Sequence, residues 1–266
     1  MSMRRWMALS FAALVLASTA LAQDAQLRRL ESGADAAGWE AVGRLNVGGT
    51  GFCTGALIAP NLVLTAGHCL FDKTTGERID HTRVEFLAGW RNGRASAYRN
   101  VRRAVVHPDY TYVGHVSSQA VRYDLALLEL DHPIRDGKII PFETAAQPRR
   151  GAEVGVVSYG TGRSEAPSLQ ELCRVLAQQD GLLVTSCSVD FGSSGAPIFV
   201  IDEGRAQIVS VVSAKAEVEG EAVSLGTSLG TPLALLQAEL VAQRDDVSPR
   251  ILGGMRRETG AKFVKP

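Results

Sequence analysis

Residues 62–69 read LVLTAGHC and place His68 and Cys69 directly behind a short apolar run. Similar short runs, separated by Gly, Pro, Asn and Asp residues, recur from Ala41 to Leu229. Many short apolar runs divided by turn residues are typical of an all-β sandwich or barrel. His68 is therefore expected at the end of a strand, where the fold can present a polar side chain to a cleft.

Two further segments combine an apolar run with a chemically useful polar residue. Residues 123–128 read YDLALL and contain Asp124, while residues 191–197 read FGSSGAP and contain Ser194. A serine hydroxyl needs an adjacent base to act as a nucleophile at neutral pH. Histidine suits that role because its ordinary pKa is about 6.5, and a carboxylate can hold its tautomer. His68, Asp124 and Ser194 are therefore the candidates for one catalytic relay.

Nucleophilic attack on a carbonyl also requires donors for the negative charge that develops on the carbonyl oxygen. One preorganised backbone N–H group is typically worth about 3–4 kcal/mol in the transition state. Gly192 leaves space for such close backbone approach. The N–H groups of Gly192 and Ser194 are therefore the candidates for an oxyanion hole.

Together the three segments resemble the signature motifs of trypsin/chymotrypsin-like serine proteases. TAGHC at 65–69 is similar to the family's T-A-A-H-C, DLALL at 124–128 to D-I-A-L-L, and GSSGAP at 192–197 to G-D-S-G-G-P. The chain order His, Asp, Ser is that of the chymotrypsin-like fold, whereas α/β-hydrolases and subtilisins use other orders. The resemblance spans about residues 41–244. It implies two six-stranded antiparallel β-barrels and is nearest to secreted bacterial proteases of the glutamyl-endopeptidase type.

Within this region the first barrel is expected at about residues 41–135 and the second at about 136–230. A C-terminal helix is predicted at 231–244, with Thr231 as N-cap and Pro232 at the first helical position. One face of this helix is apolar and carries Leu233, Leu236 and Leu240.

Both ends of the chain are expected to lie outside the barrels. Residues 1–22 have a basic start, an apolar run and a small-x-small site, which predicts a cleaved secretory signal peptide. The polar residues 23–40 predict a flexible leader or short pro-segment, and residues 245–266 a loose tail. Export to the periplasm or the medium follows from this interpretation.

Cleavage after Ala22 leaves 244 residues with 26 basic and 28 acidic side chains. Such a near-neutral chain has no electrostatic footprint for nucleic acid. No stretch after the signal peptide is long and apolar enough to span a bilayer. A monomer that acts on polypeptides, away from nucleic acid and membrane, is expected.

The four cysteines also point to an exported protein, because an even count in such a chain suggests disulfides. Sequence alone allows three pairings. The family resemblance favours Cys53–Cys69, since GFCTGALI at residues 51–58 resembles the strand that carries the partner of the cysteine beside the histidine; Cys173–Cys187 then remains. Neither a CxxC motif nor a Cys/His cluster is present, so we expect no metal and no organic cofactor.

The sequence departs from the family at Ser193, where an aspartate normally precedes the nucleophile. In trypsin-like zymogens that aspartate pairs with a newly cut N-terminus and shapes the oxyanion hole. Residues 39–45 (WEAVGRL) also lack the family's Ile-Val-Gly-Gly start. We therefore expect activity that does not depend on a free N-terminus at a defined residue.

Substrate specificity leaves a weaker trace. The resemblance places Ser188, six residues before the nucleophile, at the base of the primary pocket, which argues against cleavage after Arg or Lys. It places Ser213 and Lys215 in the pocket wall, although Ser210 is an alternative to Ser213. Asp190 could also approach the pocket. Lys215 either favours acidic side chains or is a solvated lysine on a loop.

The resemblance implies a secreted serine endopeptidase that works through an acyl-enzyme intermediate. Two alternatives stay open at this point. The loss of the aspartate at position 193 is compatible with an inactive protease fold that only binds, and an esterase would use the same three residues.

Overall fold

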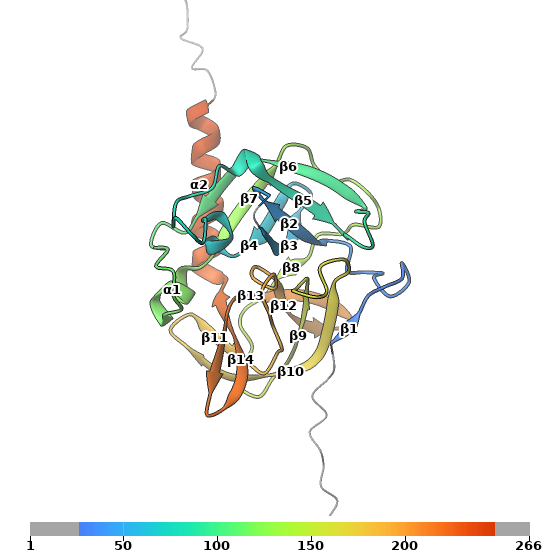
Figure 1. The fold of residues 1–266 in the computed structure, drawn as a ribbon, viewed down its shortest axis with the longest axis vertical. Coiled ribbons are helices and arrows are strands. Elements are labelled where there is room, and N and C mark those ends of the chain that lie inside the picture. The colour runs from blue at the N-terminus through green and yellow to red at the C-terminus, as the bar shows by residue number, and fades with distance from the viewer. Residues whose placement is uncertain (1–26, 50, 248–266) are drawn as a thin grey trace, which may run out of the picture.

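The computed structural model describes residues 27–49 and 51–247, which form two antiparallel β-barrels, one above the other in Figure 1. The predicted signal peptide at 1–22 lies outside the described residues, as does the chain from 248 onward. The first barrel is closed, with strand order β2-β3-β4-β7-β6-β5. Its strands are β2 (Val42–Val47), β3 (Gly51–Ala59), β4 (Leu62–Thr65), β5 (Val84–Ala88), β6 (Ala97–Val106) and β7 (Ala126–Leu130).

The second barrel runs β10-β11-β14-β13-β12-β9 and closes through pairing of β9 with β10. Its strands are β9 (Glu153–Ser158), β10 (Ser168–Gln179), β11 (Leu182–Thr185), β12 (Pro197–Asp202), β13 (Arg205–Val218) and β14 (Glu221–Ser228). Two short strands extend this sheet: β1 (Arg28–Arg29) pairs with β10, and β8 (Glu143–Thr144) pairs with β13. The predicted all-β fold of two six-stranded barrels is confirmed.

Aromatic side chains join the two barrels. The ring of Phe199, on β12, lies 4.8 Å from that of Phe142 and 5.0 Å from that of Trp39, centroid to centroid. Offset and edge-on aromatic pairs at such separations stabilise a fold beyond the area they bury. The interface between the barrels is therefore a packed apolar contact.

The C-terminal helix α2 (Gly230–Val247) leaves the second barrel and packs along β6 and β7 of the first, as the orange-red helix of Figure 1 shows. Its apolar face is the predicted one, and Leu233, Leu236 and Leu240 are all buried. The helix continues through 245–247, so the predicted loose tail begins later than residue 245. No helix among the described residues is long and apolar enough to cross a membrane.

Residues 23–40 were predicted to be a flexible leader or short pro-segment, and their described part, from residue 27 onward, packs on the second barrel. Strand β1 pairs with Leu169 and Ser168 of β10, and Leu30 is completely buried. Trp39 contacts the aromatic cluster between the barrels. The polar composition of this segment concealed these few apolar anchors, which are enough to fix the chain against the second barrel.

Three short helical segments were not predicted. The 3₁₀ turns η1 (Gly67–Leu70) and η2 (His81–Arg83) follow β4 and precede β5, respectively. Helix α1 (Ser118–Tyr123) begins after Ser117, whose hydroxyl accepts a hydrogen bond from the Ala120 N–H group. A serine at this position is a standard N-cap. Segments η1 and α1 matter because they lead directly into the candidate site.

Glu129 of β7 is a fully buried carboxylate held by three arginines. Its oxygens accept hydrogen bonds from Arg102 and Arg103 of β6 and from Arg244 of α2. Burial alone would raise the pKa of Glu129, but these three donors outweigh burial and lower the pKa below its ordinary value. The ionised side chain therefore fastens α2 to the first barrel.

We predict that Glu129→Gln lowers the free energy of unfolding at neutral pH by about 1.5–3 kcal/mol, because it removes the charged acceptor of three arginines, of which Arg103 is largely buried. The pKa of Glu129 is lower in the folded state than in the unfolded state, where it is about 4.3. The stabilisation from Glu129 is therefore complete above about pH 4.3 and is lost as the pH falls below that value toward the folded-state pKa. Urea unfolding as a function of pH should therefore show a shallower acid dependence in the variant. The control is Glu153→Gln, which removes an exposed ion pair with Arg174 and should cost less than about 1 kcal/mol.

Candidate active site

His68 and Asp124 meet because the strands beside them are neighbours. Strand β4 leads into η1 and His68, while Asp124 follows α1 and precedes β7. Thr65 at the end of β4 pairs with Ala126 at the start of β7, which places the two side chains at the same barrel edge. The Oδ1 atom of Asp124 accepts from the His68 backbone N–H at 2.7 Å, and Oδ2 lies 2.6 Å from His68 Nδ1.

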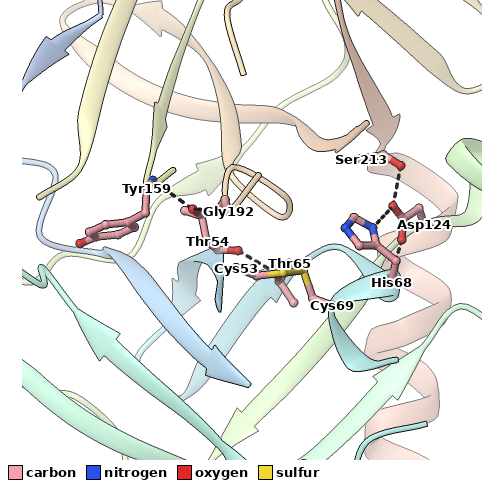
Figure 2. The surroundings of a disulfide bond; sticks show 9 residues. All are labelled: Cys53, Thr54, Thr65, His68, Cys69, Asp124, Tyr159, Gly192 and Ser213. Atoms are coloured by element: carbon pink, nitrogen blue, oxygen red, sulfur yellow. Dashed lines mark hydrogen bonds and ion pairs between the residues drawn. A yellow bond between two sulfur atoms is a disulfide. The ribbon is translucent and has the colours of Figure 1, made fainter. Parts of the chain in front are cut away.

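Ser213 provides a further donor to the same carboxylate. Its hydroxyl donates to Asp124 Oδ2 at 2.5 Å, from a point on β13 where a bulge interrupts pairing with β14. Asp124 is almost completely buried, so these donors compensate for the loss of water. With Nδ1 donating to Asp124, a neutral His68 keeps Nε2 as an acceptor. Figure 2 shows this row of Ser213, Asp124 and His68 beside the disulfide.

Ser194 lies with His68 and Asp124 in one cleft of about 430 Å³. Ser194 comes from the second barrel and is held by the Thr54 N–H group, which donates to its carbonyl at 2.8 Å. In the described part of the chain, no hydrogen bond joins the Ser194 hydroxyl to the His68 ring. Catalytic hydrogen bonds are often long without substrate and tighten when it binds. The three sequence-predicted residues thus share one cleft, which their chain positions alone do not require.

The two predicted oxyanion donors make no hydrogen bond within the described part of the protein. Among the described residues, the N–H groups of Gly192 and Ser194 have no hydrogen-bond partner. By contrast, those of Ser193, Gly195 and Ala196 donate to Asp190, Val212 and Ser193 carbonyls, respectively. Free neighbouring N–H groups of this kind can receive a developing oxyanion.

Gly192 could not be replaced without distortion. Its φ angle is +96°, and a Cβ atom there would lie 2.2 Å from the ring of Phe52. Both the backbone conformation and the space therefore require glycine.

Thr54 connects this loop to the first barrel and was missed by the sequence analysis. Its hydroxyl donates to the Gly192 carbonyl at 2.8 Å and accepts from the Tyr159 N–H at 3.1 Å. Figure 2 shows Thr54 between these two residues. A threonine inside an apolar strand carries no local signal for such long-range contacts.

The residues predicted for specificity fall into two groups. Ser213, Lys215 and Asp190 line the cleft. Ser188 is exposed and does not belong to the cleft lining; its N–H group donates to the Gln170 side chain. Ser210, the alternative to Ser213, is buried away from the cleft and donates to the Thr227 carbonyl. The prediction of Ser188 as the pocket base has no support in this geometry.

Much of the remaining cleft wall comes from a segment to which no role was assigned. Residues 110–121 contribute two tyrosines, three valines and His115, a histidine given no function from the sequence. Opposite them, Lys73 Nζ lies 5.6 Å from the centroid of the Phe191 ring, a cation–π contact between the two barrels. The wall is mixed in character, with apolar rings and several cationic groups.

Both predicted disulfides are found, Cys53–Cys69 beside η1 and Cys173–Cys187 between β10 and the segment before the nucleophile. One cluster of possible metal ligands occurs among the described residues, and it consists of Cys53, His68 and Cys69. Because the two sulfurs are bonded to each other, they are not free thiolates and cannot bind a metal as such.

Comparison with known proteins agrees with the motifs. A family model described as Trypsin matches residues 31–226. This chain belongs to the trypsin family. Its fold is similar to the solved structure of a Glu endopeptidase in complex with MPD, with a TM-score of 0.64 and 19% identity over 81% of this chain and 97% of the other.

Curated relatives are distant. The chain is 33% identical to scolexin B of Heliothis virescens over 61% of its own length and 65% of that protein. It is 30% identical to serine protease 23 of Mus musculus, with 56% and 43% covered, and 25% identical to glutamyl endopeptidase of Bacillus licheniformis, with 58% and 47% covered. The chain therefore spans between about two fifths and two thirds of these relatives' lengths.

The geometry of this trypsin-family site predicts a strongly hydrogen-bonded proton on His68 Nδ1. We expect a far-downfield proton NMR resonance that disappears in Asp124→Ala and moves upfield in Asp124→Asn, where the charged acceptor is lost. Ser213→Ala should shift the signal without removing it, because the short Ser213 bond to the same oxygen is gone. His132→Ala, an exposed histidine far from the cleft, is the control. An unchanged resonance in Asp124→Ala would contradict the assignment.

Proposed function

We propose that this trypsin-family protein is a secreted serine endopeptidase with His68, Asp124 and Ser194 as its catalytic triad. The observation that carries the proposal is one cleft lined by all three residues. Ser194, a lining residue, and Gly192, which follows the lining residue Phe191, have unpartnered N–H groups among the described residues. A nucleophile, an oriented base and a ready oxyanion site are the parts that acyl transfer needs. A polypeptide is the proposed substrate.

In the proposed reaction, the Ser194 hydroxyl attacks the scissile carbonyl while His68 Nε2 accepts its proton. Asp124 holds the imidazole through Nδ1 and stabilises the imidazolium that forms. The oxyanion accepts hydrogen bonds from Gly192 and Ser194. His68 then gives the proton to the leaving amine, which departs and leaves an acyl group on Ser194. A water molecule, deprotonated by His68, attacks the ester, and the acid product leaves with Ser194 restored.

The proposed domain limits follow the packing. The protease domain extends at least from β1 through α2, because β1, Leu30 and Trp39 are packed on the second barrel. Residues 1–22 are proposed to be a signal peptide. Two disulfides fit an oxidising compartment, which supports export to the periplasm or the medium.

We predict that the mature protein reacts stoichiometrically with a fluorophosphonate probe and that Ser194→Ala abolishes both labelling and peptide cleavage, with kcat at least about 10³-fold lower. His68→Ala should give a loss of similar size, because the two groups act as a unit. Ser96→Ala, at an exposed serine of the first barrel that does not line the cleft, is the matched control and should be labelled like the wild type.

A proteome-derived peptide library digested in parallel with a panel of esters defines the substrate class. Cleavage of peptides at Ser194-dependent sites supports the endopeptidase. Hydrolysis of esters alone would identify an esterase. A folded wild type that neither reacts with the probe nor cleaves either library would identify the inactive binding protein and refute the proposal.

A further inference from the structure

Ser193 is completely buried. It stands at the position where the family carries an aspartate that forms an ion pair with a newly cut N-terminus. Its hydroxyl accepts hydrogen bonds from Arg163 Nη2 at 2.8 Å and from the Asp190 N–H at 3.2 Å. The hydroxyl proton is directed to the Tyr159 carbonyl at 3.0 Å, with Ser158 Oγ at 3.2 Å as the alternative. One hydroxyl offers one donor and two acceptor sites, so this group is fully satisfied.

Arg163 is the only cationic side chain among these partners, and its guanidinium donates three hydrogen bonds. Besides Ser193, the guanidinium donates to the Ser158 carbonyl and, at 3.0 Å, to the Ser158 hydroxyl. Gly160 leaves the space for it, since a Cβ atom at that residue would lie 2.8 Å from the guanidinium. The guanidinium is therefore fixed between strand β9 and the loop that carries the nucleophile.

The surroundings of Arg163 are poor in compensating charge. Within the described residues it forms no ion pair, and burial lowers the pKa of its guanidinium while the more distant Asp190 acts in the opposite direction. A partly buried cation without a carboxylate partner depends on its hydrogen-bond acceptors. Displacing it from Ser158 and Ser193 would leave the partly buried cation without these acceptors, so the arrangement resists loosening.

The segment of residues 158–163 also bonds to the nucleophile loop at a second point. Thr161 donates to the Phe191 carbonyl through its N–H group at 2.8 Å and through its hydroxyl at 3.2 Å. Ser193 and Phe191 flank Gly192, so both neighbours of this oxyanion donor are fixed by residues 158–163. The segment before the first barrel pairs with β10 through Arg28 and Arg29, and the side chain of Leu30 is buried beside this pairing.

We propose that Arg163 is a positioning residue that holds the Gly192 and Ser194 N–H groups in their active arrangement through Ser193, in place of an inserted N-terminus. This inference rests on the proposed peptidase function and adds to it that the oxyanion hole is formed as soon as the chain folds. Activation by an exact cut at the N-terminus is then unnecessary.

The test compares Arg163→Gln, Arg163→Lys, Ser193→Ala and the double variant Arg163→Gln/Ser193→Ala with the wild type. Arg174→Gln is the matched control, because Arg174 is an exposed arginine of the second barrel whose side chain forms an exposed ion pair with Glu153. Activity is expressed per site titrated to completion with fluorophosphonate, so that unfolded protein is not counted. The readouts are kcat, KM and the inhibition constant of a peptide boronate, which occupies the oxyanion hole as a tetrahedral adduct.

For Arg163→Gln we expect kcat to fall about 10- to 100-fold with KM changed less than about threefold, because one displaced oxyanion donor costs up to 10²–10³-fold. Boronate inhibition should weaken in proportion to kcat/KM. Arg163→Lys should recover part of the loss, since it keeps the charge but not the fork. Ser193→Ala should resemble Arg163→Gln, and the double variant should lose little more than either alone, because both act through one contact.

The outcomes separate this inference from the proposed function. A folded wild type without probe labelling or cleavage contradicts the proposed function and this inference with it. An active wild type with Arg163→Gln at full kcat per titrated site and unchanged boronate affinity overturns the inference alone. Losses that multiply in the double variant also overturn it, since they would show that Arg163 and Ser193 act separately.

The N-terminus provides an independent prediction. Adding a Gly-Ser dipeptide to the N-terminus of the mature protein should leave kcat and KM within about twofold of the wild type, because Arg163 occupies the structural role of the inserted amine. The same measurement on Arg163→Gln tests for hidden dependence on the N-terminus. A clear loss of activity in the extended wild type would contradict the inference.

Discussion

Thr54 sets the position of one barrel relative to the other at the point where the chemistry is proposed to occur. His68 and Asp124 belong to the first barrel and Ser194 to the second, so their alignment depends on how the two barrels meet. From β3, Thr54 makes three hydrogen bonds to the second barrel, with Ser194, Gly192 and Tyr159. Its own carbonyl accepts from the Thr65 hydroxyl at the end of β4, three residues before His68. One buried residue thus links the nucleophile loop to the strand that leads to the base.

Ser193 and Arg163 reverse the usual distribution of charge at the nucleophile loop. A buried aspartate in this place requires a cation that arrives only after cleavage, because an unpaired buried carboxylate is costly. A hydroxyl removes that requirement, and the positive charge is instead built into the neighbouring segment. The consequence is a loop whose order depends on chain folding rather than on processing.

The residues of the proposed triad were accessible from sequence because each lies in a contiguous motif whose spacing reflects local backbone geometry. The contacts of Thr54 and Arg163 were not, since the bond from Thr54 to Gly192 spans 138 residues and that from Arg163 to Ser193 spans 30, and no local pattern encodes either. Ser213 was assigned to the pocket wall, and only the coordinates show its bond to Asp124. The packing of residues 27–40 was not predicted because composition averages over a segment, whereas packing depends on single anchors such as Leu30. The role of Ser188 stays a prediction, because a fixed offset from the nucleophile does not determine whether a side chain faces the cleft.

The C-terminal helix adds a second connection between the barrels. Helix α2 starts where β14 leaves the second barrel and ends beside β7 of the first, where Arg244 meets the buried Glu129. Strand β7 is also the strand that follows Asp124, so the Glu129 network anchors the same strand that positions the carboxylate of the relay. On the N-terminal side of Asp124, helix α1 is bonded to the second barrel, because the Thr227 hydroxyl of β14 donates to the Val121 carbonyl at 2.6 Å. Asp124 is therefore held between α1, which is bonded to the second barrel, and β7, which is bonded to α2. A buried acid network far from the cleft and a short unpredicted helix thus serve the same end, a fixed position for the group that orients His68.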